Sequence, residues 1–195
     1  MRIFFVTDVH GSDVCWRKFL NAGAFHKADV LIMGGDMAGK AMVPIVADGA
    51  TWQVTLQEQR HDLATEEEVR AMERRISDRG YYPVRLSHEE VDAWAADPTL
   101  VDRRFKAEII HGVERWMDMA DAKLAPTAIR CIVSPANDDM FATADAGRRG
   151  RHRRVHTRAR LTAPAESLRN LAVGHQRLVT ANMRLLRGQM GHQAP

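Results

Sequence analysis

The sequence predicts an α/β fold built on a parallel sheet, and three observations lead to it. Two short apolar runs rich in strand-forming residues occupy 2–7 and 28–33, and a third occupies 128–134. Between the first two, residues 12–27 carry apolar side chains at helical spacing. A strand, a helix and a strand within about 35 residues form a βαβ unit, whose two strands end at the same edge of one sheet.

The elements between residues 36 and 128 follow from turn and cap signals. Residues 42–57 predict a hairpin that turns at Asp48 and Gly49. Thr65 and Ser87 each begin a capping box, predicting one helix that ends near Gly80 and another that runs through Trp94. Apolar residues at spacings of three and four then predict a longer helix from about Pro98 to Leu124.

Polar residues follow each of the three buried strands directly. Asp8 and His10 follow the first, and two residues i and i+2 of an extended chain point the same way. Asp36 follows the second strand, and the third ends in Asn137, Asp138 and Asp139. A polar turn explains a single Asp-x-His as well as a site does. Three such strand ends at the edge where open α/β sheets bind ligands favour a site.

The motifs TDVHG, GGDMAG and PANDDM, in this order along residues 1 to about 140, resemble those of the calcineurin-like metallophosphoesterases. The resemblance implies a metallophosphoesterase-type β-sandwich flanked by helices. It also implies hydrolysis of a phosphomonoester or phosphodiester by a hydroxide held between two divalent metal ions. Manganese, iron and zinc all suit such oxygen and imidazole ligands, and the sequence does not distinguish them.

The resemblance also implies a role for each matching residue. Asp8 and His10 would bind the first metal, Asp36 would bridge the two, and Asn137 would bind the second through its amide oxygen. Two further residues would be catalytic: Asp138 stands where many relatives have the histidine that assists the leaving group, and Asp139 would support it. Asp138 can equally act as a helix cap or a hydrogen-bond acceptor.

Several features depart from the family pattern. Ala136 replaces a glycine, and the histidine motifs of the family's second half are missing. The nearest match, Gly174-His175, has Arg177 where the pattern has its second histidine, and His175 falls on an apolar helical stripe, which favours packing over metal binding. We therefore expect only the first half of the family fold, with an incomplete metal site and impaired activity.

The chain divides into two parts of opposite charge. Residues 1–140 carry a net charge of −6 and form the expected metallophosphoesterase-like domain, with a helical and hairpin insertion at about 41–124. Residues 141–195 carry +9, with eleven arginines and no lysine. In this tail, 145–160 is predicted to be disordered and 164–188 to form one amphipathic helix. An arginine-rich tail without the family motifs is also what a translated frameshift would produce.

Composition limits the other functions that are open. An apolar fraction of 45% and a charged fraction of 27% are ordinary for a globular protein, and no apolar run reaches 18 residues. With no secretory signal and only Cys15 and Cys131, we expect a cytoplasmic protein that acts on a phosphoester away from membranes. One alternative is nucleic-acid binding through the arginine-rich tail, although this tail lacks interleaved aromatic residues. Another is a non-catalytic fragment whose open sheet edge binds partner proteins. Oligomeric state is not predicted.

Overall fold

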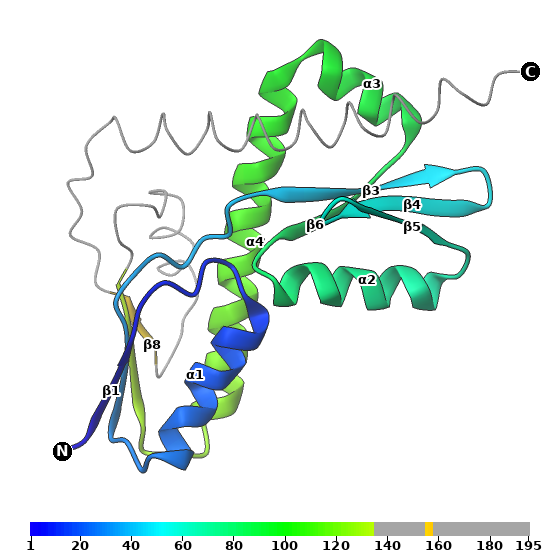
Figure 1. Ribbon diagram of the computed structural model, residues 1–195. Helices are drawn as coiled ribbons and strands as arrows, with labels where there is room; N and C mark the ends of the chain where they lie inside the picture. The colour runs from blue at the N-terminus through cyan, green and yellow to red at the C-terminus, as the bar shows by residue number, and fades with distance from the viewer. Residues whose placement is uncertain (135–154, 158–195) are drawn as a thin grey trace, which may run out of the picture.

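The computed structural model describes residues 1–134 and 155–157, and these form two four-stranded sheets and four helices (Figure 1). The first sheet, sheet A, is entirely parallel, with the strand order β1-β2-β7-β8. Its strands are β1 (Ile3–Val6), β2 (Val30–Met33), β7 (Arg130–Val133) and β8 (Val155–Thr157). The helix α1 (Asp13–Phe25) connects β1 to β2. The predicted βαβ unit and the third apolar strand are therefore confirmed.

The short strand β8 corrects one expectation. Residues 145–160 were predicted to be disordered, yet Val155–Thr157 pair in parallel with Cys131–Val133 of β7. The open edge of β7 offers backbone hydrogen-bonding groups, and a short segment with two β-branched residues can satisfy them whatever the polarity of its neighbours. The rest of the predicted disordered stretch, and the predicted helix at 164–188, lie outside the described residues.

The second sheet, sheet B, is built entirely from residues between 42 and 86, in the order β5-β4-β3-β6. The predicted hairpin is confirmed as β3 (Met42–Asp48) and β4 (Thr51–Leu56), which are antiparallel. Two further strands, β5 (Gln59–Leu63) and β6 (Tyr82–Leu86), were not predicted. Both are edge strands, and an edge accepts the polar residues of β5 more readily than a central strand would.

The three remaining helices begin at the predicted positions. Both capping boxes are present, with the side chains of Thr65 and Ser87 accepting hydrogen bonds from the backbone N–H groups of Glu68 and Glu90. They open α2 (Glu66–Asp78) and α3 (His88–Ala96). The 27-residue helix α4 (Pro98–Leu124) has the predicted bounds, with Asp97 as its N-cap and proline at its first position. No helix of the described residues is long and apolar enough to cross a membrane.

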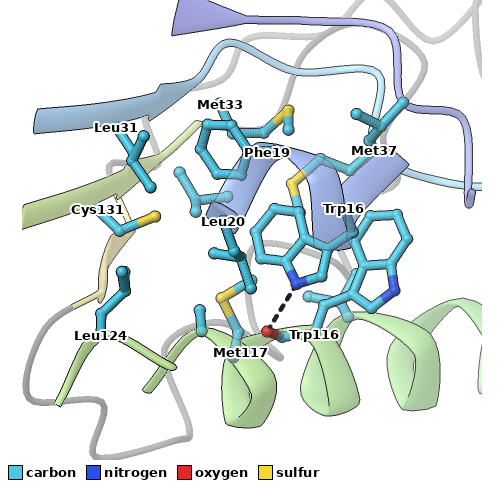
Figure 2. Packing of buried hydrophobic residues seen from close by; sticks show 14 of the residues in the cluster. Trp16, Phe19, Leu20, Leu31, Met33, Met37, Trp116, Met117, Leu124 and Cys131 are labelled. Carbon is cyan, nitrogen blue, oxygen red and sulfur yellow. Dashed lines mark hydrogen bonds between the residues drawn. The ribbon is translucent and has the colours of Figure 1, made fainter. Parts of the chain in front are cut away.

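Helix α4 contributes to the cores of both sheets. Its C-terminal half packs with α1 against one face of sheet A, where Trp16, Leu20, Leu31 and Met117 are among the buried residues (Figure 2). Its N-terminal half packs with α3 on one face of sheet B, and α2 covers the other face of that sheet. The described structure is thus a mixed α/β fold in which each sheet packs mainly on helices.

A buried carboxylate joins α1 to α4. The Asp13 side chain, 7% exposed, accepts hydrogen bonds from both terminal nitrogens of Arg115, at 2.5 and 2.9 Å, and from Nε1 of Trp116 at 2.6 Å. The Trp116 ring stacks on Trp16 with 4.9 Å between centroids. Nε1 of Trp16 donates to the Trp116 carbonyl oxygen at 3.0 Å (Figure 2). This network fixes the start of α1, immediately after the loop that carries Asp8 and His10.

We predict that Asp13→Ala destabilises the fold by about 2–3 kcal/mol, because it leaves the indole N–H of Trp116 buried without an acceptor and removes a charged acceptor from Arg115. Urea unfolding followed by tryptophan fluorescence measures the change. Asp118→Ala, at an exposed position of α4, is the control and should stay within about 0.5 kcal/mol of the unsubstituted protein. Equal losses for the two variants would contradict the assigned role of Asp13.

Candidate metal centre

The loops that follow β1 and β2 carry the candidate site, and backbone hydrogen bonds hold them side by side. The N–H groups of Asp8, His10 and Gly11 donate to the carbonyl oxygens of Gly35, Asp36 and Met37, at 3.2, 2.9 and 2.7 Å respectively. The parallel ladder between Ile3–Val6 and Val30–Met33 thus continues beyond the strands into both loops. Because the loops are paired in this way, Asp36 lies beside Asp8 and His10, as the sequence predicts.

The side chains of Asp8, His10 and Asp36 converge on one point. Each offers one ligand atom, and these atoms lie within 4.8 Å of one another. Nε2 of His10 is 3.5 Å from a carboxylate oxygen of Asp8. Ligands about 2.1 Å from a common ion lie up to about 4.2 Å apart, so small side-chain adjustments would bring all three around one metal. This donor set fits a divalent cation.

All three residues have left-handed backbone conformations. The φ angles are 60° at Asp8, 43° at His10 and 51° at Asp36. Such angles are uncommon for residues with a Cβ, although aspartate and histidine adopt them more readily than most, and they concentrate at functional sites. Three of them in one cluster indicate that the fold holds these loops in a specific shape to direct the side chains together.

The electrostatics of the cluster favour a cation. The pKa of Asp8 is lowered, and the largest cause is the hydroxyl of Thr7, which donates a hydrogen bond to the Asp8 carboxylate. Desolvation opposes this lowering of the pKa. A hydrogen bond with Asp36 and the positive charges of His10 and Lys40 lower the pKa further. Asp8 is therefore ionised at neutral pH. Two carboxyl groups this close repel each other when both are ionised, unless a proton or a cation lies between them.

One imidazole nitrogen of His10 has no hydrogen-bond partner among the described residues. The Nδ1 atom is buried and makes no hydrogen bond to the described residues, whereas the side chain as a whole is 33% exposed. A buried polar nitrogen left unpaired costs about 1–3 kcal/mol. An imidazole that binds a metal through one nitrogen usually donates from the other. Among the described residues, no acceptor for this second nitrogen is present.

Three glycines allow the backbone segments around the site to pack closely together. Gly11, Gly39 and Gly80 come from three separate segments, and their backbones touch. A Cβ on Gly11 would lie 2.6 Å from the Cα of Gly39, and a Cβ on Gly80 would overlap the carbonyl oxygen of His10. The N–H of Gly39 also donates to the hydroxyl of Tyr82 at 2.8 Å. The turn after α2, which contains Gly80, therefore packs directly against the backbone of His10.

The sequence found part of this arrangement. It identified Asp8, His10 and Asp36, which the fold brings together. The predicted ligand Asn137 and the predicted catalytic residues Asp138 and Asp139 lie outside the described residues. It missed the contribution of Thr7 and the packing of Gly80 against His10. Thr7 directly precedes Asp8 and could have been noticed, but nothing in the sequence near Gly80 points to His10.

No family model, curated protein or solved structure matches this chain.

We predict that Gly80→Ala disrupts both the fold and the metal centre, because its Cβ would overlap the His10 carbonyl oxygen. Gly49→Ala is a matched control: Gly49 also has a positive φ, 58° against 85° at Gly80, but a Cβ there meets nothing within 4 Å. Both variants should lose about 1 kcal/mol to backbone strain, and Gly80→Ala should lose at least about 2 kcal/mol more through overpacking. Urea unfolding and metal titration measure the effects, and similar losses in the two variants would contradict the packing argument.

Proposed function

We propose that this protein is a metal-dependent phosphoesterase whose metal centre is organised by Asp8, His10 and Asp36. The observation that carries the proposal is the convergence of these three side chains at adjacent carboxyl ends of a parallel sheet. This is the edge at which α/β sheets bind ligands. Its support from sequence is the motif order, which resembles that of the calcineurin-like metallophosphoesterases.

Within this proposal each residue has a role. Asp8 and His10 would hold one metal ion, Asp36 could contribute to both ions through its two carboxylate oxygens, and Asn137 would hold the second. Asp138 and Asp139 assist the leaving group. Divalent ions bound here would neutralise the phosphoryl charge and activate water for in-line attack. Thr7 stabilises the ionised form of Asp8 through its hydrogen bond.

The site is accessible to a substrate. The Asp8 side chain is 59% exposed and His10 is 33% exposed, so a phosphoester in solution can reach both. An open site of this kind excludes water poorly and orients a substrate through few contacts. Of the metal ligands that the resemblance implies, Asp8, His10 and Asp36 lie among the described residues, and a two-metal centre needs more ligands. We therefore propose weak metal binding and slow hydrolysis.

The β-sandwich implied by the resemblance belongs to the same proposal. It would require a further layer against sheet A, on the face opposite α1 and α4. The apolar side chains of Ile3 and Phe5 on that face are suited to such a layer, since they are 50% and 59% exposed.

We predict that Asp36→Asn lowers the bound metal more than any exposed carboxylate substitution does, because Asp36 alone would contact both ions. Asparagine tolerates the left-handed backbone at this position, so the fold should survive. Asp118→Asn, at an exposed position of α4, makes the same chemical change away from the site. Elemental analysis after loading with Mn²⁺ or Zn²⁺ should show at least a threefold lower metal content for Asp36→Asn. Equal contents would refute the assignment.

We also predict slow, metal-dependent hydrolysis of bis(p-nitrophenyl) phosphate or p-nitrophenyl phosphate by the full chain loaded with Mn²⁺ or Zn²⁺. Asp8→Asn should reduce the rate at least tenfold, since it removes a charged ligand at a position where asparagine fits the backbone. Asp118→Asn should leave the rate unchanged. If neither ester is hydrolysed above the rate of free metal, or if Asp8→Asn is as active as the unsubstituted chain, the proposal is wrong.

A further inference from the structure

A cavity of about 360 Å³ lies where the helices α1, α2 and α4 meet (Figure 1). Its volume is within the range of small-molecule binding sites. Its lining is dominated by charged side chains and includes arginines from all three helices: Arg17 of α1, Arg70 and Arg74 of α2, and Arg115 of α4. We call this cavity the arginine cleft.

Helical periodicity explains why α2 presents these charges to the cleft. Arg70, Arg74 and Ser77 are separated by four and three residues, so they lie on one side of the helix. A different side of α2 packs on sheet B and buries Val69, Met72 and Ile76. Arg75 follows Arg74 directly but does not line the cleft, because one residue is a turn of about 100° around the helix axis.

Direct contacts hold the walls of the cleft together. The hydroxyl of Ser12 donates to the backbone carbonyl oxygen of Asp78 at 2.7 Å, and Nη2 of Arg17 donates to the Asp78 carboxylate at 2.5 Å, which joins α1 to α2. Asp13 joins α1 to α4 through its two hydrogen bonds with Arg115. Because the walls are fixed in advance, a ligand would need to order little of the protein when it binds.

The carboxylates of the cleft are already paired with arginines, which reduces their repulsion of an anion. Asp13, Glu73 and Asp78 form ion pairs with Arg115, Arg85 and Arg17 respectively. Glu66, outside the lining, pairs with both Arg70 and Arg85. Including these partners and Arg74, five arginines stand against four carboxylates, which leaves a net charge of +1.

Arg74 supplies this surplus charge. Its side chain forms no ion pair or hydrogen bond with the described residues, and Asp78, one helical turn further on, is paired with Arg17. Each guanidinium group has five N–H donors. Arg17 and Arg70 each use one of these donors in a hydrogen bond to a carboxylate, and Arg115 uses two. The cleft therefore keeps unused cationic donors on all three walls.

We propose that the arginine cleft binds the phosphate group of a small phosphorylated ligand, with Arg74 as its principal contact. Arginine binds phosphate through two parallel hydrogen bonds, and donors on three walls suit a tetrahedral group whose oxygens point in several directions. A second cavity of about 220 Å³ adjoins the cleft at Ser77 and Arg115 and is lined by Tyr81, which leaves room for the rest of the ligand. The proposal does not depend on the proposed catalytic function.

Calorimetric titration of the metal-free full chain with pyrophosphate tests this proposal, since without metal the candidate metal centre cannot contribute. Arg74→Ala should weaken binding by at least about fivefold, because it removes charge-assisted hydrogen bonds to the ligand. Arg75→Ala is the matched control: it removes the same charge from the same helix outside the cleft, and its affinity should stay within about twofold of the unsubstituted chain. Alanine favours helix at both positions, so both variants should fold.

Charge reversal sharpens the comparison. Arg74→Glu should abolish pyrophosphate binding, whereas Arg75→Glu should weaken it only slightly. Equal affinities for the Arg74 and Arg75 variants would overturn the proposal and assign binding to other cations, such as the arginines of residues 141–195. The absence of pyrophosphate binding to the unsubstituted chain would also overturn it.

Two further ligands identify the source of the phosphate group. If adenosine monophosphate binds more tightly than inorganic phosphate, and Arg74→Ala weakens both, the cleft recognises a phosphate carried by an organic molecule. Equal affinities for the two, with the same dependence on Arg74, would assign the cleft to free phosphate. Binding of either ligand that is unaffected by Arg74→Ala would contradict the proposal.

Discussion

The parallel pairing of β1 with β2 is the constraint on which the candidate site depends. The hydrogen bonds of this pair continue past the ends of both strands, from Asp8 to Gly35 and from His10 to Asp36. Two loops that would otherwise be free to diverge are thereby held together, and their left-handed residues turn three metal-binding side chains towards one point. Side chains on loops are normally positioned less precisely than those on strands or helices. These two loops are an exception, because the hydrogen bonds of the sheet continue into them.

Helix α4 connects the site loops to the rest of the described fold. It contributes to the buried clusters of both sheets, and its Arg115 and Trp116 bind Asp13 at the start of α1. The turn at Gly80 also packs against the backbone carbonyl group of His10. The site loops are therefore supported by the α1 junction on one side and by the α2 turn on the other. The second sheet, which carries none of the three converging ligands, supports the site through these contacts.

Local sequence predicted most elements because their signals are local. Capping boxes located the starts of α2 and α3, and Pro98 and the apolar spacing gave the bounds of α4. The strands that were missed, β5 and β6, are five-residue edge strands; β5 is mostly polar, and β6 contains a proline. Their pairing depends on a neighbouring strand already being in place, and no window of the sequence contains that information. The same reason explains the short strand β8.

The sequence by itself determined which donors stand at the ends of β1 and β2, because strand periodicity and the position of Asp8, His10 and Asp36 are written in adjacent residues. Only the tertiary structure decided that these donors lie within 4.8 Å of one another and that Gly80 lies against His10. It also decided that Asp13 binds a helix about 100 residues away along the chain. Such contacts join segments whose separation in sequence carries no signal, since they form only when the whole chain has packed.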